Sequence, residues 1–270
     1  MTDNRAIVCF DIDETLITKA PHVFPESAKD AIRRLQANGH MAFINTGRTY
    51  FSTPALIKDF GFDGYICGCG SYIYLKDRKL FGSAIPHKLC TEIVQLLRDC
   101  RIPAFFEGDK AILFDDRSPA QLPVLSSIRA SLNGRTLSSL SEEEQHTYTY
   151  DKFLVMITAD SLYEKFREAS DRFFTYIDRG TENDCRVGEV IQKPYSKATG
   201  IQYLMDYFDI PLENCYAVGD STNDLAMLQF VPHSIAMGNS VPDILPFCEY
   251  HTTDILNNGI ANALRHYKLI

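Results

Sequence analysis

The sequence predicts an α/β protein with a doubly wound parallel sheet and a second, inserted α+β domain. Short apolar segments alternate with helical patterns in residues 1–82 and again in residues 187–270. Strands that are joined by helices usually run parallel in one sheet, so these two sections predict a single core domain. Residues 83–186 follow a different order of elements, which predicts a separate domain inserted between them.

In the first section, each expected helix follows an apolar strand and ends at a glycine, Gly39 or Gly61, a common helix-ending residue. The expected strands are 6–10, 41–45 and 65–67, the expected helices are 26–38 and 50–60, and 72–75 with 79–81 predict a hairpin. The last section repeats the alternation, with helices 197–208, 224–230 and 255–267 and strands 215–218 and 234–237. Both sections therefore supply strands to one sheet.

The inserted section mixes its elements differently. Its expected strands are 104–107, 111–114, 153–158 and 175–177, its expected helices are 88–99, 119–132 and 162–173, and residues 138–149 form a polar stretch. Strands and helices do not alternate regularly here, which is typical of an α+β domain.

Composition limits the possible partners. The chain has 270 residues, of which 45% are hydrophobic and 23% charged, with a net charge of -8 and a pI near 5.4. An acidic protein is a poor partner for nucleic acid, because phosphate backbones select basic surfaces. No apolar run approaches the roughly 18 residues that cross a bilayer, and no signal peptide starts the sequence. We therefore expect a cytoplasmic protein without a membrane or nucleic-acid partner, and the sequence gives no signal of an oligomeric state.

Polar residues gather where four predicted segments should meet one edge of the sheet. They are Asp11 with Asp13, Thr46-Gly47-Arg48, Lys197, and the loop 219–224. Ligands of open α/β sheets bind beyond the carboxyl ends of the strands. Taken singly, Thr46 and Asp224 could cap helices and Lys197 could be a surface lysine. Taken together and in this order, they predict a ligand site.

These segments resemble the motifs of the haloacid dehalogenase (HAD) superfamily of aspartate-nucleophile phosphatases, in particular its Cof-type group. Asp11-Ile12-Asp13-Glu14-Thr15 is similar to the first motif, Thr46 to the second, Lys197 to the third and Gly219 to Asp224 to the fourth. The resemblance covers nearly the whole chain. The insertion lies between the second and third motifs, as does the α/β cap that this group adds to its Rossmann-like core.

The resemblance implies a role for each motif residue. Asp11 would be the nucleophile and Asp13 the general acid and base. The implied Mg²⁺ ligands are Asp11, the backbone carbonyl of Asp13, Asp220 and Asp224, and the implied phosphate-binding residues are Ile12, Thr46, Gly47, Lys197 and Asn223. Lys197 is also expected to separate the charges of Asp11 and Asp220, with Lys193 as the second choice for the cation. Oxygen ligands of this kind suit Mg²⁺.

The activity that follows is Mg²⁺-dependent hydrolysis of a small phosphorylated metabolite through an aspartyl phosphate. The resemblance implies sugar phosphates first, with pyridoxal phosphate or a nucleotide as alternatives. A phosphomutase of the same superfamily, or a non-catalytic phosphate-binding or regulatory protein, would use a similar set of residues.

Two positions depart from the group's pattern: Glu14 replaces the usual glycine, and Cys69-Gly70 replaces Asn-Gly. A negative charge at about 6 Å opposes the binding of a dianion by roughly 2 to 3 kcal/mol per unit charge at an effective dielectric near 20. The Glu14 side chain is therefore expected to turn towards solvent, the hinge of the inserted domain or a basic partner such as Arg48.

Overall fold

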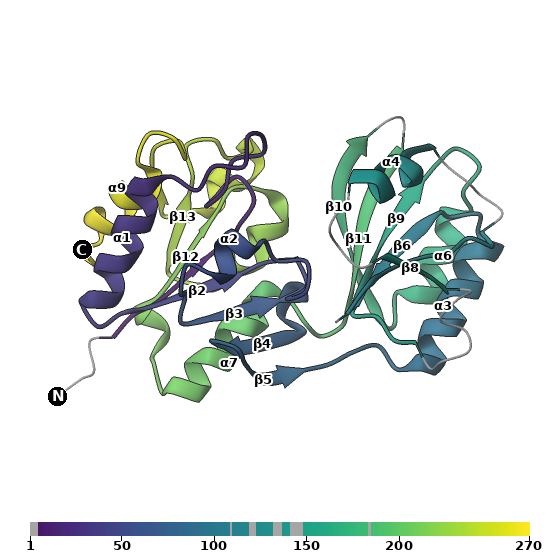
Figure 1. Ribbon diagram of the computed structural model, residues 1–270, viewed down its shortest axis with the longest axis horizontal. Coiled ribbons are helices and arrows are strands. Elements are labelled where there is room, and N and C mark those ends of the chain that lie inside the picture. Colours follow the sequence, from purple (N-terminus) through teal and green to yellow (C-terminus); the bar gives the residue numbers. More distant parts are fainter. Residues whose placement is uncertain (1–4, 109, 119–122, 132–136, 141–147, 183–184) are drawn as a thin grey trace. The chain divides into compact units, whose positions relative to one another are not determined.

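The computed structural model describes residues 5–108, 110–118, 123–131, 137–140, 148–182 and 185–270 (Figure 1). The chain forms two compact units. Unit 1 contains Met1–Arg48, Thr53–Gly82 and Tyr195–Ile270, and unit 2 contains Thr49–Ser52 and Ser83–Pro194. The α/β class with an inserted, second domain is thereby confirmed.

Unit 1 is built on an eight-stranded sheet in the order β14-β13-β12-β1-β2-β3-β4-β5. The strands are β1 (Ile7–Phe10), β2 (Met41–Asn45), β3 (Gly64–Cys67), β4 (Tyr72–Leu75), β5 (Arg78–Gly82), β12 (Cys215–Gly219), β13 (His233–Ala236) and β14 (Tyr250–His251). Strand β1 lies between β12 and β2 and is parallel to both. Only the β3-β4 and β4-β5 pairs of this sheet are antiparallel, as expected for the hairpin. The ends of β1, β2 and β12 therefore meet at one edge.

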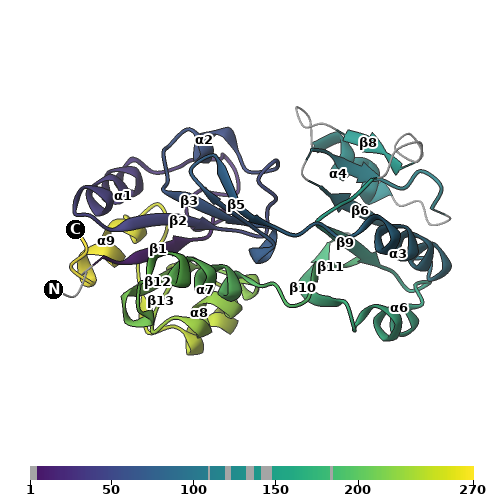
Figure 2. The ribbon, with the colours of Figure 1, turned by 90° about the horizontal axis from the view of Figure 1, so that it is seen from below.

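Helices cover both faces of this sheet, with α1 on one side and α7 and α8 on the other (Figure 2). The helices are α1 (Glu26–Ala37), α2 (Ala55–Lys58), α7 (Lys197–Phe208), α8 (Leu225–Phe230) and α9 (Gly259–His266). Alternate side chains of β1, Ile7 and Cys9, pack with Ile201 and Leu204 of α7 in one buried cluster. Strand β1 is apolar on both faces because both faces are covered.

Two helices of unit 1 are much shorter than the sequence predicted. The expected helix 50–60 is reduced to α2, which starts directly after Pro54. Proline inside a helix removes a hydrogen bond and clashes with the preceding turn, so it belongs at a helix start. The expected helix 255–267 begins only at Gly259, because Asn258 has a left-handed backbone (φ 62°). Strand β14 was not predicted.

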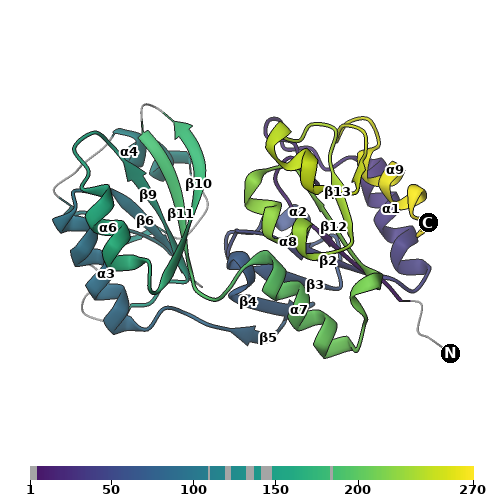
Figure 3. The same cartoon turned by 180° about the vertical axis from the view of Figure 1, so that it is seen from behind.

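Unit 2 contains a six-stranded sheet in the order β10-β11-β9-β6-β7-β8. Its strands are β6 (Ala104–Glu107), β7 (Ile112–Phe114), β8 (Leu137–Ser139), β9 (Lys152–Ile157), β10 (Phe174–Glu182) and β11 (Cys185–Gln192). Helices α3 (His87–Asp99) and α6 (Tyr163–Ser170) pack side by side on one face (Figure 3). Helix α4 (Pro123–Ser131) packs Leu125 and Ile128 against a second buried cluster of this unit.

The chain returns to unit 1 later than expected. The expected boundary, at residue 187, falls inside β11. Strand β11 pairs with β9 and β10, and the division between the units lies between Pro194 and Tyr195. The ends of the expected helix 119–132 and most of the polar stretch 138–149 lie outside the described residues. None of the helices in the described part of the chain combines the length and apolar character needed to span a bilayer.

Candidate active site

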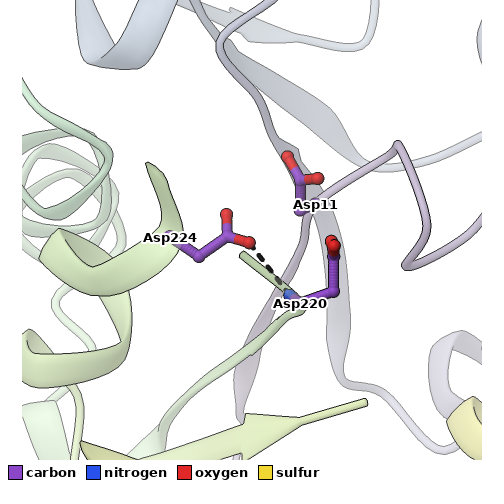
Figure 4. A group of neighbouring side chains, drawn as sticks. All are labelled: Asp11, Asp220 and Asp224. Atoms are coloured by element: carbon purple, nitrogen blue, oxygen red, sulfur yellow. Dashed lines mark hydrogen bonds between the residues drawn. The ribbon is translucent and has the colours of Figure 1, made fainter. Parts of the chain in front are cut away.

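Three aspartates lie together at the carboxyl edge of the unit 1 sheet (Figure 4). Asp11 directly follows β1, Asp220 directly follows β12, and Asp224 lies one turn later. Because β1 and β12 are parallel neighbours, their ends place these side chains side by side. One carboxylate oxygen of each residue lies within 4.8 Å of the other two, and all three residues are buried.

Asp224 also shapes the loop that carries it. Its Oδ2 accepts hydrogen bonds from the backbone N–H of Asp220 (3.0 Å) and Ser221 (3.2 Å). A Cβ added to Gly219 would lie 2.6 Å from the Asp224 carboxyl group, so only glycine fits at the start of this loop. The Thr15 hydroxyl donates to Oδ1 of Asp220 at 3.0 Å. The loop geometry thus fixes two of the three carboxylates.

Lys197 is the cation of this cluster. It is the first residue of α7, whose N-cap Ser196 forms a capping box with Thr199. Its ammonium group donates to Oδ1 of Asp11 (2.6 Å) and to Oδ1 of Asp224 (2.5 Å), and its side chain is 1% exposed. Lys197 therefore bridges Asp11 and Asp224, rather than Asp11 and Asp220 as the sequence suggested.

Lys193, the second choice for the cation, belongs to unit 2 and has its partner there. Its ammonium group donates to the backbone carbonyl of Asp171 in unit 2 at 2.6 Å. The assignment of the third motif to Lys197 thus agrees with the packing of the aspartate cluster.

Burial and mutual repulsion shift the titration of this cluster. Burial, and then the neighbouring Asp224 charge, raise the pKa of Asp11 to about 7 against the lowering effect of Lys197. Burial, Asp224 and Asp11 raise the pKa of Asp220 to about 8. Burial alone would lower the pKa of Lys197, but Asp11 and Asp224 outweigh it and hold this pKa above its ordinary value.

The donor set fits a divalent cation. Three carboxylates and one ammonium leave two surplus negative charges when all are ionised, which a divalent ion would balance. Oxygen donors alone favour a hard cation over zinc or copper. Asp11, Asp220 and Asp224 are the residues that would hold it.

Asp13 has a different environment from the buried aspartates. Its side chain is 52% exposed, and both carboxylate oxygens accept hydrogen bonds from the Arg48 guanidinium, at 2.7 and 2.8 Å. Bidentate pairs of this kind fix the orientation of a carboxylate. Arg48 follows the second motif at the end of β2, and it reaches Asp13 because β1 and β2 are neighbours in the sheet. The sequence did not reveal this ion pair.

The remaining predicted residues occupy neighbouring strand ends and loops. Thr46 and Gly47 follow β2, and the Thr46 hydroxyl accepts from the backbone N–H of Arg48 at 3.1 Å. Ile12 is fully buried beside Asp11. Asn223 lies in the loop before Asp224, where its Oδ1 accepts from the Ser221 hydroxyl at 2.6 Å.

Glu14 is half-buried, so its side chain turns only partly towards the solvent that was one of its expected directions. Its Oε1 atom is buried and has no hydrogen-bond partner in the described part of the chain. Arg48, its expected basic partner, holds Asp13 instead. The Glu14 backbone is left-handed (φ 61°), and its carbonyl accepts from Nδ2 of Asn239 at 2.7 Å. A left-handed backbone explains in physical terms why glycine suits this position.

The fold and the acidic edge define a class: α/β proteins with an aspartate cluster at the strand ends and an inserted second domain. Residues 8–264 match the model of the haloacid dehalogenase-like hydrolase family, so the chain belongs to that family. The chain is a hydrolase of phosphate monoesters, and its second, mixed sheet gives it the fold of solved subclass IIB members of the family.

Individual relatives are distant but cover the full length. YkrA of Bacillus subtilis is 24% identical over 268 residues, which cover 98% of each chain. The 5-amino-6-(5-phospho-D-ribitylamino)uracil phosphatase YitU of the same organism is 24% identical, with 97% of each chain covered. Among solved structures, a Geobacillus kaustophilus protein has a TM-score of 0.82 at 25% identity over 98% of this chain and 100% of its own. The subclass IIB sugar phosphatase BT4131 has a TM-score of 0.79 at 24% identity, with the same coverage.

Proposed function

We propose that the protein is a Mg²⁺-dependent phosphatase that hydrolyses small sugar phosphates through an aspartyl phosphate on Asp11. The observation that carries the proposal is the buried cluster of Asp11, Asp220 and Asp224 around the Lys197 ammonium group. Phosphate-monoester hydrolysis is among the slowest uncatalysed reactions, so the site must supply a reduction of roughly 20 kcal/mol in the barrier. Fixed opposite charges in a buried site are the main source of such a reduction.

The proposed chemistry has two steps. An Asp11 carboxylate oxygen attacks phosphorus, the bond from phosphorus to the leaving oxygen breaks, and Asp13 gives that oxygen its proton. Water then attacks the phosphoryl group while Asp13 takes its proton, and the Asp11–phosphorus bond breaks to release inorganic phosphate. Lys197 holds the Asp11 carboxylate and balances phosphoryl charge. A bound Mg²⁺ would supply further neutralisation of the phosphate dianion.

The Arg48 pair matters for the timing of proton transfer. The Arg48 guanidinium donates to both oxygens of the Asp13 carboxylate, and a carboxylate is the form that accepts a proton from water in the second step. Donating a proton in the first step requires the protonated form. The pair must therefore open before the leaving group departs.

Support for a sugar phosphate as substrate comes from the relatives. YitU is named for a substrate with a phosphoribityl group, and BT4131 is titled a sugar phosphatase. Other relatives of similar identity, such as the HMP-PP phosphatase of Yersinia enterocolitica, are named for a different substrate. The substrate is therefore a proposal for this chain, whereas hydrolysis of small phosphorylated metabolites is the shared activity.

Turnover of a panel of phosphorylated sugars, pyridoxal phosphate and nucleotides, with Mg²⁺ and after chelation, tests the proposal. We expect Mg²⁺-dependent release of inorganic phosphate, fastest with a sugar phosphate. Full activity after exhaustive chelation would contradict the metal dependence. Transfer of phosphate within the substrate, without release, would instead identify a phosphomutase, and absence of any turnover would favour a binding protein.

A further inference from the structure

We propose that Asn45 and Gly70 are positioning residues, which hold the first turn of α7 so that the Lys197 ammonium reaches Asp11 and Asp224. The inference rests on the proposed function, because it gives both residues a part in phosphoryl transfer. Neither residue belongs to the aspartate cluster, and each acts on the backbone of α7 from a different strand end.

Asn45 ties α7 to the sheet edge. It is the last residue of β2, it is fully buried, and its Nδ2 donates to the backbone carbonyl of Lys197 at 2.9 Å. Strand β2 is the parallel neighbour of β1, in register at Ile44 and Phe10. A side chain at the end of β2 thus fixes the backbone of Lys197 close to the strand end that carries Asp11.

The turn after β3 supports the same helix. Gly68, Cys69 and Gly70 have consecutive positive φ angles of 56°, 54° and 92°. This turn is joined to the second motif, because the N–H groups of Gly68 and Cys69 donate to the carbonyls of Arg48 (2.8 Å) and Thr46 (3.1 Å). Two segments of the site therefore share one turn.

Gly70 makes the close contact with α7. A Cβ at this position would lie 2.2 Å from the backbone oxygen of Ser196 and 3.0 Å from its carbonyl carbon. Both atoms belong to the backbone of the helix cap, so a side chain at position 70 must displace the turn or the start of α7. Because Ser196 directly precedes Lys197, a shift of the Ser196 backbone also moves the backbone of Lys197.

Such a displacement would act on short contacts. The Lys197 ammonium lies 2.6 Å from Asp11 and 2.5 Å from Asp224, which are the distances of charge-assisted hydrogen bonds. A misplacement of about 1 Å at a reacting centre costs up to about 100-fold in rate. The place of α7 is therefore a condition for catalysis as well as for folding.

Matched substitutions separate this contact from general backbone strain. Gly70→Ala is compared with Gly39→Ala, because Gly39 has a similar φ (89°) but nothing within 4 Å of an added Cβ. With p-nitrophenyl phosphate and Mg²⁺, we expect kcat to fall about 10- to 100-fold in Gly70→Ala. The Gly39→Ala enzyme should stay within about twofold of wild type once it is folded.

Asn45→Ala gives a second, independent test in case Gly70→Ala does not fold. Its control is Ser234→Ala, because Ser234 is also a buried strand residue whose hydroxyl bonds only to backbone, donating to the Phe247 carbonyl and accepting from the Glu249 N–H in the described part of the chain. We expect kcat to fall about fivefold in Asn45→Ala, as for the loss of one hydrogen bond, and less than about twofold in the control.

A Lys197→Ala background shows whether the two residues act through the lysine. There, Gly70→Ala and Asn45→Ala should lower kcat by less than about twofold further, while their effects on the urea midpoint persist. The inference would be overturned if the kcat losses of these substitutions multiplied with that of Lys197→Ala. It would also be overturned if the variants and their controls lost equal kcat. In both cases the proposed function would stand. An inactive wild-type enzyme would overturn the proposed function and the inference together.

Discussion

Glu14 has a backbone conformation and a side-chain environment that are both unfavourable for a glutamate. Its backbone is left-handed, its Oε1 is buried without a hydrogen-bond partner among the residues that the structure describes, and it lies directly after Asp13. A non-glycine residue in this conformation costs roughly 1 kcal/mol, and a buried unpaired polar atom costs about 1 to 3 kcal/mol more. Glu14 should therefore lower the stability of the folded protein.

Glu14→Gly should accordingly raise the free energy of unfolding by about 1.5 to 3.5 kcal/mol, because the greater freedom of glycine in the unfolded state offsets about 0.5 kcal/mol of these costs. The control is Lys76→Gly, because Lys76 has a similar φ (52°) but an exposed side chain, and its gain should be about 0.5 kcal/mol. Urea denaturation measures both. A stability gain in Lys76→Gly as large as that in Glu14→Gly would show that the buried carboxylate oxygen costs nothing.

At the scale of elements, the parallel pairing of β1 and β12 brings two acidic strand ends together. The free energy of unfolding should therefore depend on pH. In metal-free protein, Asp11 and Asp220 have folded-state pKa values of about 7 and 8, well above the ordinary value of 3.8. At pH values between 3.8 and these raised pKa values, the folded state binds more protons than the unfolded state. Its stability is then greatest at low pH and is lost as pH rises.

Chelated protein should therefore show a free energy of unfolding that falls from about pH 5 to pH 8, by up to about 1.4 kcal/mol per pH unit for each group. Asp220→Asn should make this fall shallower, which isolates the site from other titrating groups. Added Mg²⁺ should stabilise the protein more at pH 8 than at pH 5, because the ion binds ionised carboxylates. The result could instead be a free energy of unfolding that stays level from pH 5 to pH 8 in chelator, with the same slope in Asp220→Asn. That result would contradict the shared burial of these carboxylates.

The elements also show what the sequence can and cannot reveal. The strands that carry Asp11 and Asp220 are short apolar runs with a clear start and end, so their position was predictable, and parallel pairing brought their ends together. Strand β11 was missed because Glu189 is a charge inside it. The partner that allows its burial, Lys152 at 2.6 Å, lies 37 residues away on β9.

Side-chain partners within the site were harder to predict than its members. The order of the motifs indicated which residues gather, but not that Lys197 bridges Asp11 to Asp224, or that Arg48 holds Asp13. These pairings depend on the exact direction of each side chain at a strand end or helix start. No spacing in the sequence encodes that direction.

At the scale of the whole molecule, unit 2 carries its own hydrophobic core. The two buried clusters of this unit draw all their members from residues 85–190, and β11 is an inner strand that pairs with β10 and β9. A fragment of residues 83–194 should therefore fold alone and unfold cooperatively in urea. A fragment of residues 83–186 should not, because it lacks most of β11. Equal cooperativity in both fragments would place the end of the domain before β11.

The central claim is that Asp11 becomes covalently phosphorylated, and an acid-quenched reaction tests it most directly. Asp13→Asn should slow hydrolysis of the intermediate, because the asparagine amide accepts no proton from water, whereas p-nitrophenyl phosphate still forms the intermediate, because its leaving group departs without a proton. Peptide mapping by mass spectrometry of the quenched Asp13→Asn enzyme, mixed with this substrate and Mg²⁺, should then find one phosphoryl group on Asp11, and none when Asp11→Asn is added. Phosphate on another residue, or an Asp11→Asn enzyme that keeps more than about a tenth of wild-type kcat, would contradict the claim.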